Sequence, residues 1–259
     1  MRILAIGDIC GEQGCERLLK ILPKFKKENQ IDFTVVNGEN SADTNGISGH
    51  SAEIILNAGA DVVTGGNHTL HRKDFRHLLD ENERLLRPHN IPSAQYGSGY
   101  CLVDMGYARV AVINLLGQVY LDMHEAENPF LCADTLLQRA SNDGANIILV
   151  DFHAEATSEK KALGFYLDGK VSALFGTHTH VQTNDATILP NGTAYITDLG
   201  MSGPVHSVLG VKPEIIIERF KNGEKGRFVF AEGENDIQGI VFEVDPKTSK
   251  ALWIKTVKF

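Results

Sequence analysis

Short apolar runs alternate with amphipathic segments through the first third of the chain. Continuous apolar runs bounded by polar residues predict buried strands, whereas apolar residues spaced by three and four predict helices. Strands are expected at residues 2–6, 33–36 and 61–64, and helices at residues 16–28, 51–58 and 73–79. This βαβαβα order predicts a largely parallel sheet with right-handed crossovers.

The pattern changes twice in the rest of the chain. A hairpin that turns at Gly106 is expected first, followed by βα units and then by antiparallel strands. The expected strands are 99–104, 108–114, 146–152, 171–175, 193–197, 226–232, 237–244 and 251–257, and the helices are 134–142, 159–167 and 213–220. This order favours two packed sheets over one doubly wound sheet. Because no repeat or linker interrupts it, we expect residues 1–259 to form one domain.

Composition and charge exclude several classes of function. The net charge of −8, without a basic run, disfavours polymeric nucleic acid as the main partner. No apolar run approaches the roughly 18 residues that span a bilayer, and the apolar start is too short for a secretory signal. We therefore expect a cytoplasmic protein without a membrane partner. The cysteines (Cys10, Cys15, Cys101 and Cys132) have no Cys-x-x-Cys spacing, which argues against a zinc ribbon or a disulfide framework.

Polar side chains directly follow five of the predicted strands. Because ligands of open α/β sheets bind outside the carboxyl ends of the strands, we expect these side chains to gather at one edge. They are Asp8, then Glu39 and Asn40, then Asn67 and His68, then His153, and finally His178 and His180. Glycines precede most of them and permit tight turns there.

This mixture of imidazole, carboxylate and amide groups predicts metal binding. It suits iron, manganese or zinc, and it lacks the thiolates of a structural zinc site. A catalytic ion takes about three protein ligands, so the set predicts two ions that share a bridging carboxylate. In such a site a bridging water or hydroxide attacks phosphorus in line, and a non-ligating histidine protonates the leaving alkoxide. His68, displaced by one residue from Asn67, is the natural proton donor.

The order of these motifs resembles that of the calcineurin-like metallophosphoesterases. Gly7-Asp8, Gly38-Glu39-Asn40, Gly66-Asn67-His68, His153 and Gly176-Thr177-His178-Thr179-His180 carry the resemblance. Longer motifs at 37–40, 151–160, 176–183 and 194–198 are similar to the bacterial YmdB-like phosphodiesterases, and the likeness covers essentially the whole chain. It implies a four-layer α/β-β/α sandwich of two mixed sheets and a dinuclear centre of iron or manganese, with zinc as an alternative. It also implies hydrolysis of 2′,3′-cyclic nucleotides, with 3′,5′-cyclic nucleotides as a further option, by a homo-oligomer (dimer or tetramer).

The resemblance also implies a role for each position. One metal would be held by Asp8, Glu39, Asn40 and His180, and the other by Glu39, Asn67, His153 and His178. Glu39 would bridge the two metals, and His68 would donate the proton.

The chain departs from the broad superfamily at two positions. The first motif is usually Asp-x-His, whereas here it is Asp8-Ile9-Cys10, and the bridging residue is usually Asp, whereas here it is Glu39 followed by Asn40. The longer carboxylate and the adjacent amide offer a replacement for the missing imidazole. Cys10 is open to two interpretations, a thiolate ligand or a buried structural thiol, and the second is favoured.

Other interpretations stay open at this point. Asn40 could cap a turn, Glu155 could orient an imidazole, and Asp198 could either line the pocket or cap a turn. The polar stretch 117–129, with Asp122 and His124, is expected to be a loop. The same centre could instead serve a phosphomonoesterase, or a regulator that binds a nucleotide without hydrolysing it.

Overall fold

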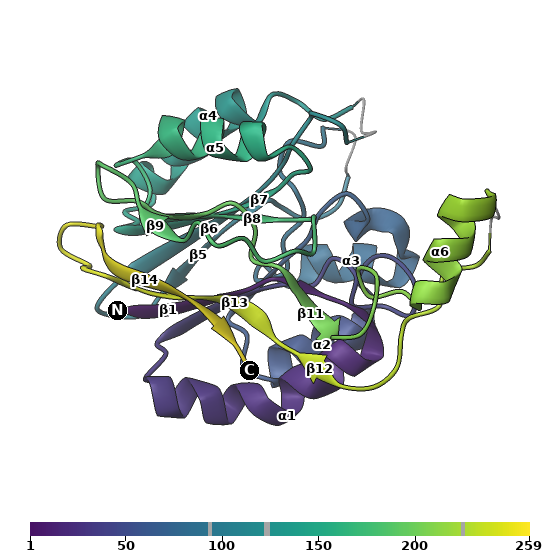
Figure 1. Ribbon diagram of the computed structural model, residues 1–259. Coiled ribbons are helices and arrows are strands. Elements are labelled where there is room, and N and C mark those ends of the chain that lie inside the picture. The colour runs from purple at the N-terminus through teal and green to yellow at the C-terminus, as the bar shows by residue number, and fades with distance from the viewer. Residues whose placement is uncertain (93–94, 122–124, 224–225) are drawn as a thin grey trace.

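The fold consists of two large mixed sheets that pack face to face, with helices on both outer faces (Figure 1). The computed structural model describes residues 1–92, 95–121, 125–223 and 226–259. No helix in these ranges is long and apolar enough to cross a bilayer.

The first sheet has the strand order β14-β13-β1-β3-β4. Its strands β1 (Arg2–Ile6), β3 (Phe33–Asn37) and β4 (Val62–Thr64) are parallel, whereas β13 (Gln238–Val244) and β14 (Ala251–Lys258) are antiparallel additions. The helices α1 (Gly11–Asn29), α2 (Gly49–Asn57) and α3 (Lys73–Glu81) are linked with it in one apolar core. That core contains Leu4 of β1, Leu18 of α1 and Phe75 of α3.

The second sheet has the strand order β5-β6-β7-β8-β10-β9. The central strands β6 (Arg109–Leu116), β7 (Ile147–His153), β8 (Ala173–Thr177) and β10 (Ala194–Ile196) are parallel. The edges β5 (Tyr100–Asp104) and β9 (Thr187–Ile188) pair antiparallel. The helices α4 (Pro129–Asn142) and α5 (Thr157–Leu167) pack on its outer face, where Leu136 and Leu163 meet Phe152.

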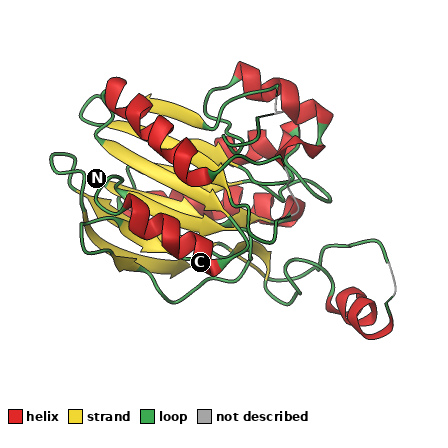
Figure 2. Ribbon diagram, turned by 90° about the horizontal axis from the view of Figure 1, so that it is seen from above, coloured by secondary structure: helices red, strands yellow, loops and turns green. Residues whose placement is uncertain are grey.

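A third, small sheet joins the N-terminal segment to the end of the chain. Its order is β12-β11-β2, with β2 (Asp8–Ile9), β11 (Met201–Pro204) and β12 (Asn235–Asp236). Between β11 and β12 the chain makes an excursion that carries α6 (Pro213–Asn222). We call residues 205–223 and 226–234 the arm. Figure 2 shows α6 set apart from the body of the molecule.

The central core confirms the predicted four-layer sandwich. It lies between the sheets and combines Ile3 and Phe33 of the first sheet with Val112, Leu149 and Phe175 of the second, all at most 1% exposed. Each sheet buries one face against the other sheet and its outer face against a layer of helices. The order of the layers is therefore α/β-β/α.

Several predicted boundaries differ from the structure for local reasons. α1 begins at Gly11 and α4 at Pro129, five residues earlier than predicted in each case. The Asn128 side chain accepts hydrogen bonds from two backbone N–H groups of α4, and proline fits its first turn. The strand predicted at residues 226–232 is wrong. Among the described residues, this segment makes one isolated bridge, from Phe230 to Val211, because its apolar side chains line pockets instead of joining a sheet. Of the predicted loop 117–129, Asp122 and His124 lie outside the described residues.

Among the glycines that precede predicted site residues, Gly7 and Gly176 would bring a Cβ atom closest to backbone, and Gly176 lies near the end of β8. A Cβ atom there would lie 1.9 Å from the backbone oxygen of Thr197 and 2.9 Å from Cδ of Lys160. We expect Gly176→Ala to lower the free energy of unfolding by about 1–3 kcal/mol or more, because backbone must move. Urea denaturation measures this change. Gly226→Ala is the control, since its Cβ would meet only Ile215 at 3.8 Å. Equal effects of both substitutions would contradict the prediction.

Candidate metal centre

The carboxyl ends of β1, β3 and β4 meet those of β7 and β8 at one edge of the sandwich. Contacts of 4 Å or less link all eight predicted site residues into one continuous cluster. The sequence-based expectation that these strand ends gather at one place is therefore met by the geometry.

One half of the cluster is built from two imidazoles and an amide. Nε2 of His153 lies 3.1 Å from Nδ1 of His178 and 3.1 Å from Oδ1 of Asn67. Oε1 of Glu39 lies 3.9 Å from the same nitrogen. Burial lowers the pKa of His178 to about 4 and lowers that of His153 well below its usual value. Both rings are therefore neutral at pH 7, with lone pairs available for a metal.

The other half contains His180, Asn40 and Asp8. The amide of Asn40 lies 3.1 Å from Nε2 of His180, and Oδ1 of Asp8 lies 3.8 Å from that nitrogen. The two ends of an amide are interchangeable in assignment, so oxygen can face the ring as readily as nitrogen. Asp8 is fully buried, and its Oδ1 has no hydrogen-bond partner among the described residues.

Glu39 lies between these halves and is fully buried. Its carboxylate accepts hydrogen bonds from the backbone N–H groups of Gly66 and His68 and from the hydroxyl of Thr69. Burial nevertheless raises its pKa to about 8. A carboxylate held in this way favours a nearby cation, which would restore its charged form.

A layer of buried polar side chains beneath the cluster orients its histidines. Asp151 of β7 accepts hydrogen bonds from Asn37 (2.9 Å), Thr64 (2.5 Å) and Thr177 (2.7 Å). Oγ1 of Thr177 in turn lies 3.0 Å from Nδ1 of His153. This partner turns Nε2 of His153 toward His178 and Asn67, as outer-layer hydrogen bonds do in metal sites.

The turn that carries His178 and His180 is strained and firmly supported. Both residues have positive φ angles, 101° and 64°, which side chains other than glycine seldom adopt. Asp198 accepts hydrogen bonds from the backbone N–H (3.1 Å) and hydroxyl (2.7 Å) of Thr179 between them. Asp198 also forms a fully buried ion pair with Lys160 of α5 at 2.7 Å. Oε2 of Glu155 lies 3.0 Å from Nε2 of His178 and so fixes that ring from outside.

The donor set fits metal ions better than it fits an ordinary polar core. Ligands bound at about 2.1 Å to one octahedral ion are roughly 3.0 Å apart, which matches the 3.1 Å separations on both sides. Oδ1 of Asp8 is a buried acceptor that no described residue hydrogen-bonds, and such groups are costly. No three His, Cys, Asp or Glu side chains among the described residues form a metal site by themselves. The amides of Asn40 and Asn67 complete the two groups.

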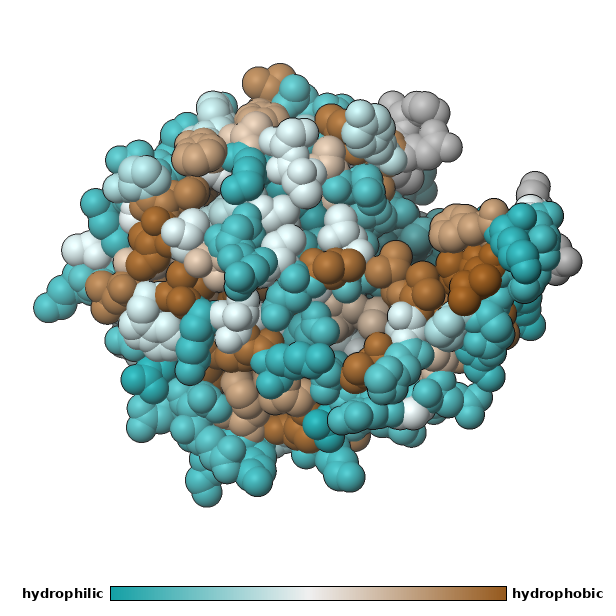
Figure 3. All heavy atoms as spheres, in the orientation of Figure 1, coloured by the Kyte–Doolittle hydropathy of each residue, from teal (hydrophilic) through white to brown (hydrophobic). Residues whose placement is uncertain are grey.

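A cavity of about 540 Å³ opens over the cluster, between it and the arm. Its polar wall is formed by Asn40, Asp43, Thr44, Asn45, His68, Glu155, His178, Thr179 and His180, and its apolar wall by Val208, Leu209, Val211, Ile216, Phe220, Phe228 and Phe230. Figure 3 shows this apolar surface where the arm meets the body.

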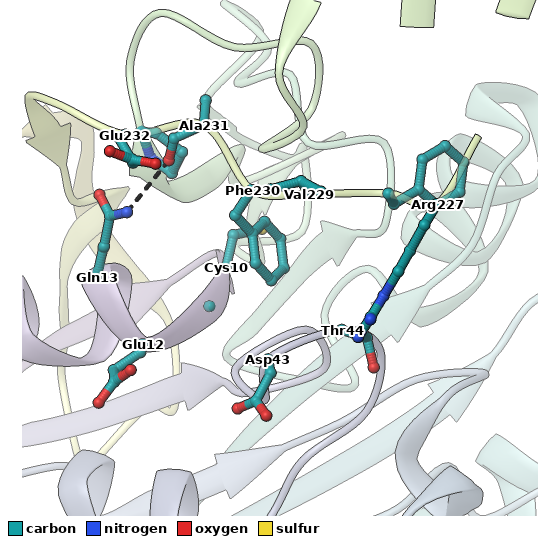
Figure 4. Close-up of a pocket in the computed structure, with 13 residues that line it drawn as sticks. Cys10, Glu12, Gln13, Asp43, Thr44, Arg227, Val229, Phe230, Ala231 and Glu232 are labelled. Carbon is teal, nitrogen blue, oxygen red and sulfur yellow. Dashed lines mark hydrogen bonds between the residues drawn. The ribbon is translucent and has the colours of Figure 1, made fainter. Parts of the chain in front are cut away.

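A second cavity, of about 400 Å³, lies across the segment 228–230. In Figure 4, Phe230 lies over Cys10, and Arg227 extends toward Thr44. Cys10 is buried, and its sulfur lies 3.8 Å from Nδ1 of His180, the ring nitrogen opposite the one that faces Asn40. The thiol thus lies on the side of the His180 ring away from Asn40, and both interpretations of Cys10 stay predictions.

The chain matches the family model described as "YmdB-like protein" over residues 4–257. It belongs to the YmdB-like family. It is 44% identical to the protein of Bacillus subtilis named 2′,3′-cyclic-nucleotide 2′-phosphodiesterase, over 99% of this chain and 96% of that protein.

Solved structures agree with this family assignment. A novel phosphatase from Mycoplasma pneumoniae has a TM-score of 0.94 at 33% identity, over 100% of this chain and 93% of that one. A 5′-nucleotidase precursor from Thermus thermophilus has a TM-score of 0.57 at 12% identity, over 100% of this chain and 54% of that one, and it supports the fold alone. The predictions of a YmdB-like protein and of a phosphoesterase enzyme are confirmed.

Sequence reasoning left some features of this YmdB-like site open and missed others. Asn40 faces His180, Glu155 contacts His178, and Asp198 holds the turn through Thr179 without lining the cavity. The roles of Lys160 and of the apolar arm were missed. Lys160 lies inside the motif 151–160, but only its complete burial reveals its partner.

The ion pair of Lys160 and Asp198 provides a stability test. We expect Lys160→Met to lower the free energy of unfolding by about 3–5 kcal/mol, because it leaves Asp198 buried without a counter-charge. The adjacent Lys161 is the matched control, since its pair with Asp185 (3.5 Å) is partly exposed. Lys161→Met should cost less than about 1 kcal/mol. Chemical denaturation measures the free energy of unfolding of both variants. Equal losses in the two variants would contradict this account of the turn.

Proposed function

We propose that this YmdB-like protein is a dinuclear metal-dependent phosphodiesterase that hydrolyses 2′,3′-cyclic nucleotides. The observation that carries the proposal is the double cluster of imidazoles, amides and carboxylates that meets at buried Glu39 below a single cavity. The name of the Bacillus subtilis relative supports the choice of substrate.

In this proposal each half of the cluster holds one metal ion. Asp8, Asn40 and His180 would hold the first ion, Asn67, His153 and His178 the second, and Glu39 would contact both. Such ions supply Lewis acidity toward phosphoryl oxygens and a hydroxide nucleophile at neutral pH. Thr177 and Glu155 keep the rings of His153 and His178 in place.

His68 would supply the proton in the reaction. Its ring borders the cavity, and its Nδ1, 3.5 Å from Glu39, has no hydrogen-bond partner in the part of the chain that the structure describes. Burial lowers its pKa to about 4, so the ring is neutral at pH 7 in the free protein, and a bound anionic phosphate would favour its protonated form. Water loses one proton to solvent and adds to phosphorus, one P–O bond of the cyclic diester breaks, and His68 protonates the leaving oxygen and regains its proton from solvent. The product is a nucleoside monophosphate.

Several further predictions stay predictions. The geometry does not test iron or manganese as the metals, a homo-oligomeric state, activity on 3′,5′-cyclic nucleotides or a cytoplasmic location. One domain over residues 1–259 is supported by the central core, which takes side chains from both sheets.

Substitution of His68 tests the proposed reaction. We expect His68→Ala to lower kcat for 2′,3′-cyclic AMP by about 10²–10⁴-fold, because the leaving oxygen loses its proton donor. Metal content should stay at the wild-type level. His77→Ala is the control, because His77 lies exposed on α3. Wild-type turnover by His68→Ala would remove His68 from the mechanism.

The same assay separates the alternative functions. A rate on p-nitrophenyl phosphate far above that on bis-p-nitrophenyl phosphate would favour a phosphomonoesterase. Tight binding of the cyclic nucleotide without product would favour a regulator. Undiminished hydrolysis after strong chelation would rule out the metal-dependent mechanism.

Metal analysis tests the assigned ligands directly. We expect about two ions per chain in the wild type. Glu39→Gln should lose most of both, because it removes the charge shared by the two halves, whereas Asn67→Ala should lose mainly one. Elemental analysis after dialysis measures the content. Glu53→Gln, at an exposed position of α2, should retain the wild-type content. Full occupancy in Glu39→Gln would contradict the bridging role.

A further inference from the structure

The apolar wall of the cavity belongs entirely to the arm. Leu209, Val211, Ile216, Phe220, Phe228 and Phe230 face the histidines across the opening. The hydrolysis of a phosphodiester requires only the polar wall. An apolar wall at this place therefore calls for a ligand with an apolar part.

Phe220 is the most exposed residue of this wall. Its side chain is 83% exposed, whereas Ile216, one helical turn earlier on the same face of α6, is 9% exposed. Exposed aromatic side chains that border a pocket are typical of ligand sites. The face of Phe228 is different, because the guanidinium of Arg219 lies over it at 4.9 Å. Phe220 is thus the more accessible aromatic surface.

We propose that Phe220 is a stacking platform for the nucleobase of the substrate. The inference rests on the proposed function, which brings a cyclic phosphate to the polar wall. The ribose then directs the base away from the histidines, toward the arm. Bases stack on aromatic side chains without regard to sequence, since every base presents a π-face. The cavity volume of about 540 Å³ is within the range of small-ligand sites, about 300–1,000 Å³.

The platform makes the enzyme prefer nucleotides over other cyclic diesters. Its effect is confined to substrates that carry a base, because Phe220 lies on the wall opposite the proposed chemistry. Glycerol 1,2-cyclic phosphate contains the same five-membered cyclic diester without a base. The ratio of kcat/KM for 2′,3′-cyclic AMP to kcat/KM for this compound therefore reports on the platform alone.

Steady-state kinetics of the metal-loaded full chain test the proposal. We expect Phe220→Ala to lower this ratio by about 5–150-fold, mainly through a higher KM, because base stacking is lost. Phe220→Tyr should restore most of it. Ile217→Ala is the matched control, since Ile217 is exposed on the same helix but does not line the cavity. An unchanged ratio in Phe220→Ala, or an equal loss with both substrates, would overturn the proposal.

Calorimetric binding of adenosine monophosphate separates this inference from the proposed function. If the wild type hydrolyses neither diester, the proposed function fails. Binding of adenosine monophosphate then decides whether Phe220 stacks on the base. Weaker binding by Phe220→Ala than by the wild type and Ile217→Ala supports the platform, whereas equal or absent binding overturns it. Light scattering provides one further outcome. A smaller assembly in Phe220→Ala, with equal kinetic losses on both diesters, would mean that a second copy covers Phe220 instead.

Discussion

The buried carboxyl group of Asp151 fastens the two sheets together at the edge where the site is built. It accepts hydrogen bonds from Asn37 and Thr64 of the first sheet and from Thr177 of the second. Burial raises its pKa to about 7, so the fold keeps a carboxyl group where water cannot stabilise its charge. Loss of one partner would leave the others unsatisfied in a dry interior, which is costly. The relative position of the sheets is therefore set here more firmly than by apolar packing alone.

The candidate metal centre depends on that alignment because its residues come from both sheets. Asp8 and Glu39 follow strands of the first sheet, whereas His153 ends one strand of the second sheet and His178 follows another. A small slip between the sheets would separate the two imidazoles from the carboxylates. Misplacement of reacting groups by about 1 Å can cost on the order of 100-fold in rate.

The gathering of the candidate site residues could be predicted from the sequence because it depends on a local rule. A polar residue at the carboxyl end of a parallel strand reaches the same edge in any such sheet, so Asn67 and His153 could be placed without knowledge of the packing. The pairing of Lys160 with Asp198 could not be predicted, since it joins a helix to a strand end 38 residues away. The start of α1 was misjudged because the glycine and polar residues of its first turn hid the periodicity, and the start of α4 because its cap, Asn128, and the following proline were not recognised as a helix start.

The arm shows a second limit of sequence reasoning. Phe228 and Phe230 lie in a segment whose apolar content is typical of a strand, yet they line cavities. Periodicity identifies the side chains that are buried, but it does not identify the groups that they pack against. Only the three-dimensional path of the chain distinguishes a sheet partner from a pocket.

The turn that carries His178 and His180 has a consequence for how the two half-sites behave together. Both imidazoles project from one turn of three residues, in which His178 and His180 have positive φ angles and Thr179 between them donates to Asp198. Neither ring can be displaced by a backbone movement that leaves the other in place. The two half-sites therefore move together, and the turn sets the distance between the imidazoles of His178 and His180.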